Sequence, residues 1–304
     1  MSGRVVKNKS GTFYAVSAAS GRLGHAVLRA LLADTAADNI VAIARSPEKL
    51  QIAGIDRRSG DYNSVASMAT ALAGVDTLIM ISAPVGDWDR VLMHRNVIAA
   101  ARQAGVRKIV FTSVIGNGQE QDTWFWGTQQ VNRQTEQDLQ SSGLDWVIAR
   151  NGLYLEMDLR HIIHANTAGV YRNVGGDGKC GYITIDELAF AIARLAQSDR
   201  DNGKTFNLVG QNLSQAELVQ LANEVLGLKV CYQTLSDEEN IALLMQDEKI
   251  AVRGRDVARM LTGCFQCVRN GAFDVESDFT AAAGRPVKTT RRMIEELRAA
   301  SAAA

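Results

Sequence analysis

The chain has 304 residues, of which 46% are hydrophobic and 22% charged, and its 33 basic and 33 acidic side chains give a net charge of zero. This composition is ordinary for a globular protein, and the lack of a basic excess argues against a protein that binds nucleic acid or an anionic membrane. No run of about 18 uncharged apolar residues occurs, which argues against a membrane span.

The start of the chain and its cysteines indicate a compartment. Residues 1–11 are polar and basic, and no apolar segment typical of a secretory signal follows them. Four cysteines in a chain of this length do not make a disulfide framework. We therefore expect a cytoplasmic location.

The first half of the chain alternates short apolar runs with amphipathic segments. The runs, nearly continuous as in strands covered on both faces, are residues 12–17, 39–44, 75–82, 107–113 and 145–150. Between them apolar residues recur at helical spacing, as in Leu23, Val27 and Leu31. This alternation predicts an α/β fold with a doubly wound, Rossmann-like parallel sheet.

A turn of small residues follows the first predicted strand. A dinucleotide-binding turn needs small residues at three places, for the bend, for the approach of the pyrophosphate and for helix packing. Ala18, Gly21 and Gly24 hold these places here. Because open N–H groups at a helix N-terminus attract anions, we interpret as the pyrophosphate site the residues Ala18, Ser20, Gly21, Arg22, Leu23 and Gly24. The methyl group of Ala18 should weaken binding slightly; the alternative is a turn that binds nothing.

The second predicted strand ends in a cation. In NAD-binding proteins a carboxylate at this point bonds the ribose 2′-hydroxyl, but here Arg45 follows the strand and Lys49 lies one helical turn later. A guanidinium holds a 2′-phosphate through paired hydrogen bonds, whereas a carboxylate would repel it. Arg45 and Lys49 therefore predict NADP(H) as the cofactor, with a solvated arginine as the alternative.

After residue 150 the alternation loosens. We predict helices over 154–165 and 184–197, a turn at 175–179, strands at 205–209 and 230–235, and mostly helical structure from 236 to 304. Ser214 and Glu217 form a capping box that predicts the start of another helix.

These patterns suggest two parts. We assign residues 11–152, with a return segment at about 182–210, to an NADP-binding Rossmann domain. Residues 153–181 and 211–304 form a smaller, mostly helical, substrate-binding lobe over the carboxyl edge of the sheet, where ligands bind in open α/β proteins.

Longer stretches resemble the NmrA-like branch of the atypical short-chain dehydrogenases/reductases, and within it the bacterial NADPH quinone oxidoreductases and triphenylmethane reductases. The resembling stretches follow the family's order and spacing and are residues 17–32, 41–49, 60–82, 94–113, 149–156 and 176–189. The resemblance implies the same fold and NADPH-dependent oxidoreductase activity.

The resemblance also implies positions for the rest of the cofactor. Asp61 and Tyr62 would lie near the adenine. At the other end, the residues that would flank the ribose and nicotinamide or lie by the reacting end are Ser82, Ala83, Pro84, Ser113 and the segment 151–154. This chain departs from the family at Ala18, where others carry Gly, and at Asn132, where many relatives carry Lys or His four residues before the position of Glu136.

The chain lacks the proton relay of common carbonyl reductases, which pairs a Tyr with a Lys four residues later. None of the six tyrosines has Lys at that distance. Quinones and cationic dyes accept hydride without a dedicated acid, so catalysis would depend mainly on holding the nicotinamide against the acceptor. We predict Tyr154, with Asn151 or Asn132 as hydrogen-bond donors, as the polar complement to an acceptor oxygen.

Two functions follow from these observations. The first is an NADPH-dependent oxidoreductase that transfers hydride to a small aromatic, quinone-like or otherwise conjugated electrophile. The alternative is a non-catalytic NADP(H)-binding redox sensor that acts through a protein partner. Trp124, Phe125 and Trp126 could stack on a flat ligand or form a local hydrophobic cluster. Whether the chain forms a homodimer does not follow from the sequence.

Other chemistry-bearing residues have simpler interpretations. Cys264 and Cys267 form a CxxC without a second pair, and His161 and His164 lack further ligands, so we predict no metal site. His25 and His94 are interpreted as residues on helix faces. The charged stretches 253–259 and 285–298 are interpreted as solvated helix faces.

Overall fold

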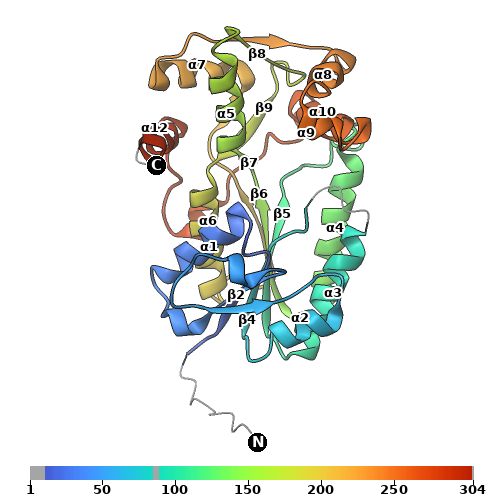
Figure 1. The fold of residues 1–304 in the computed structure, drawn as a ribbon, viewed down its shortest axis with the longest axis vertical. Coiled ribbons are helices and arrows are strands. Elements are labelled where there is room, and N and C mark those ends of the chain that lie inside the picture. Colours follow the sequence, from blue (N-terminus) through green and yellow to red (C-terminus); the bar gives the residue numbers. More distant parts are fainter. Residues whose placement is uncertain (1–10, 85–88, 303–304) are drawn as a thin grey trace, which may run out of the picture.

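Seven parallel strands form the central sheet of the computed structural model, which describes residues 11–84 and 89–302 (Figure 1). The strands are β1 (Tyr14–Val16), β2 (Ile40–Ala44), β3 (Asp56–Ser59), β4 (Thr77–Met80), β5 (Lys108–Val114), β6 (Asp145–Asn151) and β10 (Lys204–Leu208). Their order is β10-β6-β5-β4-β1-β2-β3, and every neighbouring pair is parallel. The order reverses between β1 and β4, which places a ligand crevice at their carboxyl ends. The predicted doubly wound sheet is confirmed.

The third strand was not among the strands predicted from apolar runs. β3 has the sequence DRRS, lies at the edge of the sheet and is largely exposed. Strands covered on both faces are apolar, whereas an edge strand carries charges that protect its open side. A search for apolar runs therefore finds the inner strands and misses this one.

Helices cover both faces of the sheet. On one face lie α1 (Arg22–Leu32), α6 (Ile185–Gln197) and α11 (Phe279–Ala283); on the other lie α2 (Val65–Ala71), α3 (Arg90–Gln103) and α4 (Trp126–Gln140). Alternate strand residues supply the two cores: Val16 packs with α1 and α6, and Ala15 packs with α2 and α3. This alternation follows from the two-residue period of a strand.

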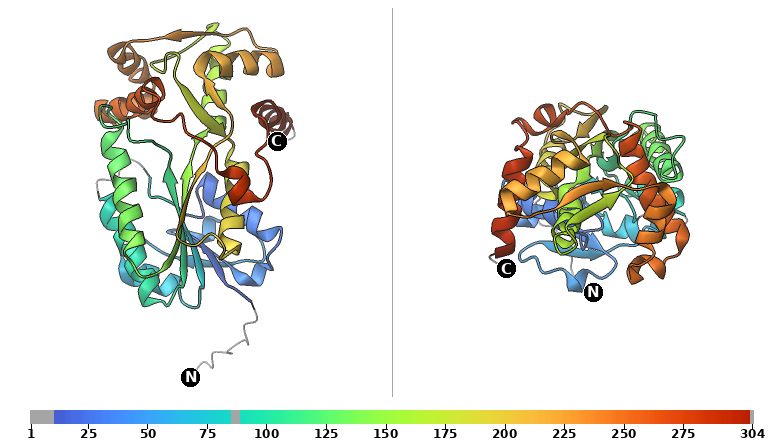
Figure 2. Two further views of the ribbon diagram at one scale, coloured as in Figure 1. Left: turned by 180° about the vertical axis from the view of Figure 1, so that it is seen from behind. Right: turned by 90° about the horizontal axis from the view of Figure 1, so that it is seen from above.

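The remaining elements form a lobe beyond the carboxyl ends of β5 and β6 (Figure 1). Its helices are α5 (Leu155–Ala165), α7 (Gln215–Leu226), α8 (Asp237–Leu244), α9 (Glu248–Ala251), α10 (Arg255–Arg269) and α12 (Thr290–Ala302). Its strands are β7 (Leu153–Tyr154), β8 (Val170–Asn173), β9 (Lys179–Ile183), β11 (Asn212–Ser214) and β12 (Cys231–Thr234), in the orders β11-β9-β7 and β12-β8. Figure 2 shows the C-terminal helix α12 beside this lobe, where it packs on α7. The mostly helical C-terminal part is as expected, and the domain boundaries stay a prediction.

Capping boxes begin two helices of the lobe. Ser214 accepts a hydrogen bond from the Glu217 N–H, and the Glu217 carboxylate accepts one from the Ser214 N–H, so the predicted capping box is confirmed. Ser236 and Glu239 form a second box at the start of α8, which the sequence analysis did not single out.

No helix among residues 11–84 and 89–302 is long and apolar enough to cross a membrane. Residues 1–10, in which we expect no secretory signal, lie outside the described residues.

Candidate cofactor and acceptor site

The turn between β1 and α1 leaves a helix N-terminus open. Gly21 is the N-cap of α1 and has no side chain to bond the first N–H groups of the helix. Its own N–H donates to the Ala18 carbonyl oxygen at 2.9 Å, which closes the turn. The N–H groups at the start of α1 can therefore bind an anion.

Gly24 lets the helix approach the turn. A Cβ at this position would lie 2.6 Å from the Ala18 carbonyl oxygen and 3.0 Å from the Ala19 Cα. Both atoms belong to the backbone, which cannot move aside without changing the turn. Gly24 thus fills the helix-packing role of the third small position in such turns.

Ala18 adopts a conformation that usually belongs to glycine. Its φ is +49°, and it is the one non-glycine residue with positive φ among the described residues. For a residue with a Cβ this left-handed conformation costs about 1–2 kcal/mol. The departure from glycine, predicted to weaken cofactor binding, therefore also strains the turn itself.

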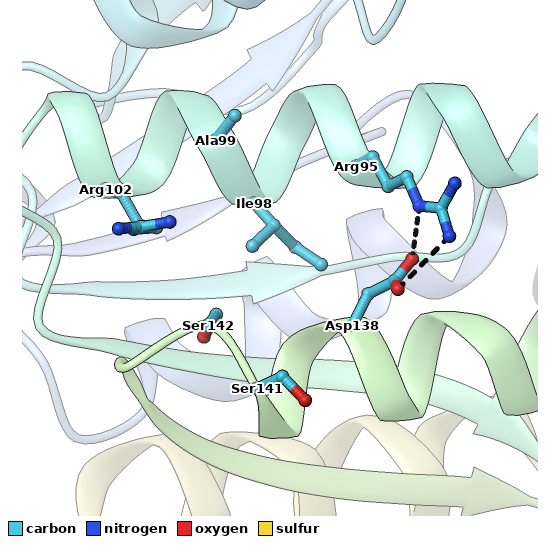
Figure 3. Close-up of a pocket in the computed structure, with 7 residues that line it drawn as sticks. All are labelled: Arg95, Ile98, Ala99, Arg102, Asp138, Ser141 and Ser142. Carbon is cyan, nitrogen blue, oxygen red and sulfur yellow. Dashed lines mark hydrogen bonds and ion pairs between the residues drawn. The ribbon is translucent and has the colours of Figure 1, made fainter.

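A pocket of about 420 Å³ adjoins this turn. It is lined by Ser20, Gly21, Arg22, His25, Ala26, Arg29, Glu156, Ile185 and Asp186. The turn, the start of α5 and the start of α6 thus meet at one hollow. A second pocket, of about 270 Å³, lies between α3 and α4 beside the Arg95–Asp138 ion pair (Figure 3). None of the predicted site residues lines the second pocket.

Two exposed cations follow β2. Arg45 comes directly after the strand, and Lys49 ends the short 3-10 helix Pro47–Lys49. Neither side chain forms an ion pair with any residue in 11–84 or 89–302. Positive charge is therefore available at the strand end where the sequence analysis places the 2′-phosphate.

The residues assigned to the adenine end have internal partners. The Tyr62 hydroxyl lies 2.5 Å from Ser17 Oγ and 2.7 Å from the Ile81 carbonyl oxygen, and its side chain is buried. Burial raises the pKa of this phenol. Asp61 Oδ1 accepts from the backbone and side-chain nitrogens of Asn63. Tyr62 thus ties β1 to β4, and its nearness to an adenine stays a prediction.

The segment after β4 is held from α3. The buried Ala83 N–H donates to His94 Nε2 at 2.9 Å. Arg90, also buried, donates from Nε to the Ala83 carbonyl oxygen at 3.1 Å and from Nη2 to Ser82 Oγ at 2.8 Å. Pro84 is exposed. Two basic side chains thus fix the segment predicted to border the nicotinamide, and neither role was predicted from the sequence.

His94 lies on a face of α3, as predicted, and this face is buried. Its side chain is fully buried, and burial next to Arg90 lowers its pKa to about 3. Thr135 Oγ1 donates to the Val131 carbonyl oxygen, so it accepts from His94 Nδ1, 2.8 Å away. His94 is therefore neutral, with its proton on Nδ1.

Asn132 is occupied at both ends of its amide. Nδ2 donates to the Thr128 carbonyl oxygen at 3.1 Å, and Oδ1 accepts from Arg90 Nη2 at 3.4 Å. Ser82 Oγ lies 3.5 Å from the same Oδ1. The structure therefore brings Asn132 to Ser82, as expected for one site, but its amide chiefly fixes its neighbours.

A buried carboxylate lies beneath the ends of β5 and β6. Glu136 Oε1 accepts from Ser113 Oγ and from Arg133 Nη1, each at 2.6 Å. Arg150 adds Nη2 to Oε2 at 2.6 Å and Nε to Oε1 at 3.0 Å. Ser113 was predicted from the sequence but the two arginines were not, because Arg150 lies 14 residues from Glu136 and Arg133 lies 20 residues from Ser113, so that only folding brings the group together.

Tyr154 and Asn151 meet on the other side of β6. Asn151 ends the strand, and Tyr154 precedes α5. Burial raises the pKa of the Tyr154 phenol, and the neighbouring Asn151 side chain lowers it. Asn151 Oδ1 is buried and has no hydrogen-bond partner among the described residues.

The remaining candidates are explained by packing. Phe125 is buried against Phe273, as in a local hydrophobic cluster, while Trp124 and Trp126 are 40% and 36% exposed, and their stacking on a flat ligand stays a prediction. Cys267 is buried and lies 3.3 Å from Thr123 Oγ1. Burial raises the pKa of both Cys264 and Cys267, which disfavours reactive thiolates.

Two further groups of side chains lie elsewhere in the molecule. His161 and His164 on α5 are exposed, and among residues 11–84 and 89–302 no three His, Cys, Asp or Glu side chains are grouped so that they could hold a metal ion. Arg285 was expected on a solvated face, but it forms a double hydrogen bond with the buried Glu187 and lies over the Phe190 ring. Its planar guanidinium allows both contacts at once.

The fold and the open helix terminus define a dinucleotide-binding α/β protein. The family model described as NAD(P)H-binding matches residues 18–199. The chain is 35% identical over 291 residues to quinone oxidoreductase 2 of Escherichia coli (strain K12), a match that covers 93% of this chain and 98% of that protein. A crystal structure of the NADPH-dependent quinone oxidoreductase QOR2 of Escherichia coli with NADPH superposes with a TM-score of 0.85 at 31% identity, over 94% of this chain and 100% of that one.

Two other relatives extend the comparison. Triphenylmethane reductase of Citrobacter sp. superposes with a TM-score of 0.84 at 28% identity, over 93% of this chain and 98% of that one. An NmrA-like family domain-containing oxidoreductase of Aspergillus flavus is 30% identical over 233 residues, covering 74% of this chain and 75% of that protein. The chain belongs to the NAD(P)H-binding family and to its NmrA-like oxidoreductases. The predicted family and the predicted class, an NAD(P)H-dependent oxidoreductase, are confirmed.

Proposed function

We propose that the protein is an NADPH-dependent reductase that transfers hydride to a quinone-like or otherwise conjugated electrophile without a Tyr–Lys pair. One observation carries the proposal. An open helix N-terminus and an exposed cation lie at the carboxyl ends of β1 and β2, and buried polar groups lie at the carboxyl ends of β4 and β5. The quinone and dye reductases among the relatives support this acceptor class.

The chain's residues fit NADPH. The turn at Ser20–Leu23 would bind the pyrophosphate, Gly24 permits the close approach, and Arg45 with Lys49 would bind the 2′-phosphate. Along the same edge, the residues that would border the adenine and the nicotinamide are Asp61, Tyr62, Ser82, Ala83, Pro84 and Ser113. When bound, NADPH supplies a hydride from its nicotinamide.

Tyr154 is the proposed contact to the acceptor. Because burial raises its pKa, the phenol keeps its proton at neutral pH and donates a hydrogen bond. Asn151, at the end of β6 beside Tyr154, would donate a second hydrogen bond from its amide Nδ2 to the acceptor oxygen. Asn132 acts indirectly, since it fixes Ser82 together with Arg90.

Kinetics of NADPH oxidation with a panel of quinones, dyes and enones test the proposal. We expect turnover with at least one quinone, and we expect Tyr154→Phe and Asn151→Ala each to lower kcat/KM about 10-fold through the loss of one hydrogen bond. If neither variant changes quinone turnover, the assignment of Tyr154 and Asn151 is wrong.

The alternative is an NADP(H)-binding sensor that acts through a protein partner. It is favoured by the uncharged Asn132 and by the absence of a Tyr–Lys pair from the sequence. The same assay separates the two functions: NADPH binding without turnover of any acceptor supports the sensor. Cytoplasmic location and a homodimer stay predictions.

A further inference from the structure

Two guanidinium groups share one buried carboxylate at the acceptor end of the sheet. Glu136 is 4% exposed and binds both Arg133 and Arg150 at 2.6 Å. Arg133 also lies 3.4 Å from Ser113 Oγ and donates from Nη2 to the Val114 carbonyl oxygen at 3.2 Å. The three groups together carry one net positive charge.

This charge lies next to the proposed acceptor contacts. Val114, whose carbonyl binds Arg133, is the register partner of Asn151 across β5 and β6, and Ser113 is the partner of Arg150. Arg133 therefore approaches the strand ends from α4, while Tyr154 lies in β7, three residues after the end of β6. An acceptor over these strand ends would lie between the two.

Both guanidinium groups keep exposed surface that a ligand could contact. The Arg133 side chain keeps 21% of its surface exposed and that of Arg150 keeps 25%. Arg133 donates hydrogen bonds from Nη1 and Nη2 to described residues, but not from Nε. Arg150 donates from Nε and Nη2 to Glu136, but not from Nη1 to any described residue. Two further buried charges belong to the surroundings: Glu120, whose carboxylate acts on Arg133 and accepts at Oε1 from Gln129 Nε2, and Arg90 after the end of β4. With both counted, three cations and two carboxylates still leave one net positive charge.

The charge distinguishes two kinds of hydride acceptor. A neutral quinone that takes up a hydride becomes a hydroquinone monoanion, which one proton from solvent then converts to the hydroquinone. A cationic triphenylmethane dye that takes up a hydride becomes a neutral leuco compound, with no further proton. A fixed cation stabilises the transition state of the first reaction and repels the substrate of the second.

We propose that Arg133 and Arg150 select neutral acceptors whose reduction gives an oxyanion and discriminate against cationic dyes. The proposal rests on the proposed function and narrows it to one charge class of acceptor. Arg133 is a specificity-determining residue, because its guanidinium binds the end of β5 and the carboxylates of Glu136 and Glu120 offset only two of the three cations, Arg90, Arg133 and Arg150.

The test compares two acceptors in the full-length protein at saturating NADPH. We expect Arg133→Gln to lower kcat/KM for a neutral naphthoquinone about 20-fold, the scale of one partly buried charge interaction. For a cationic triphenylmethane dye the same variant should leave kcat/KM unchanged or raise it. Arg133→Lys keeps the charge and should retain most of the quinone activity.

Controls separate charge from folding. Arg95→Gln removes an exposed ion pair with Asp138 in the α3–α4 pocket (Figure 3) and should change neither acceptor's kinetics. The NADPH dissociation constant of Arg133→Gln should stay within about twofold of wild type, since the hydrogen-bond partners of Arg133 include none of the residues assigned to the pyrophosphate or the 2′-phosphate.

Each outcome decides a different point. Equal losses for quinone and dye, or an unchanged quinone rate with a folded Arg133→Gln protein, overturn charge selection while leaving the reductase in place. A Lys variant as inactive as the Gln variant also overturns it. Failure of the wild-type protein to reduce any acceptor while it binds NADPH overturns the proposed function, and this proposal with it.

Discussion

The two ends of the candidate site are built differently. At the cofactor end, the turn after β1 and the cations after β2 come from short contiguous segments and are partly exposed. At the acceptor end, Ser82, Arg90 and Asn132 come from three elements and are held by buried contacts across as many as 50 residues. The first end presents unbonded groups to a ligand, and the second presents groups that are already bonded to one another.

This difference has a functional meaning. Open N–H groups and free cations bind a ligand that brings its own charges, as a phosphate does. Buried, mutually bonded side chains are preorganised and cost no reorganisation when a reaction develops charge beside them. We therefore expect changes at the cofactor end to alter binding and changes at the acceptor end to alter stability and turnover.

The largest effect is expected from Glu136→Gln at the acceptor end. This substitution leaves Arg133 and Arg150 without their shared carboxylate and should lower the free energy of unfolding by about 2–3 kcal/mol, since breaking a buried ion pair is strongly destabilising. Urea denaturation measures the change. Glu224→Gln, in the exposed pair with Arg291, is the matched control and should leave the midpoint unchanged. A midpoint for Glu136→Gln equal to that of the control would contradict the buried network.

The next effect is expected at the cofactor end. Arg45→Asp replaces the exposed cation after β2 by a carboxylate and should raise the dissociation constant for NADPH about 100-fold, because a charge-assisted contact becomes a repulsion. The constant for NADH should change less than about threefold. Calorimetric titration with both nucleotides measures the two values, and Lys49→Gln should show a smaller effect of the same kind. Equal changes for both nucleotides would mean that Arg45 does not contact a 2′-phosphate.

A pH effect separates His94 from surface histidines. The pKa of buried His94 is about 3, while an unfolded histidine titrates near 6.5, so between these values the unfolded chain binds the extra proton. Stability from the neutral His94 is thus complete above pH 6.5 and falls as the pH decreases toward 3. Between pH 7.5 and pH 5 the wild-type protein should lose about 2 kcal/mol more than His94→Gln.

One other buried group, Asp158, changes the stability with pH in the opposite direction. Burial raises the pKa of Asp158 in the lobe to about 6, so this carboxyl group makes the fold more stable as the pH falls. Asp158 is present in both proteins, and its effect drops out of the difference. Identical pH profiles for the wild type and His94→Gln would show that His94 is not buried in the neutral form.

The smallest effect is expected at Ala18. Ala18→Gly relieves the left-handed strain at φ +49° and should raise the free energy of unfolding by about 0.5–1 kcal/mol, after the larger entropy of an unfolded glycine is subtracted. Removing the methyl group should also tighten NADPH binding about twofold. Thermal unfolding and calorimetry measure both changes. A less stable Ala18→Gly protein would contradict the strain, and an unchanged affinity would mean that the methyl group does not face the pyrophosphate.

The same contrast explains what the sequence could and could not predict. The apolar strands, the turn at residues 18–24 and the cation Arg45 are contiguous signals, and the confirmed doubly wound parallel sheet follows from the strand and helix alternation. β3 was missed because an edge strand is polar. His94, Arg90 and Arg133 were missed because an arginine or histidine on a helix has the same pattern whether it is solvated or buried against a strand end 8 to 20 residues away.

The central claim is that a dinucleotide with a 2′-phosphate binds at the start of α1 and at Arg45. Calorimetric titration of the wild-type protein with NADPH and then with NADH tests it most directly. We predict a dissociation constant for NADPH at least about 10-fold below that for NADH, because the 2′-phosphate gains charge-assisted hydrogen bonds. Equal affinities, or no binding heat from either nucleotide at millimolar concentration, would contradict it.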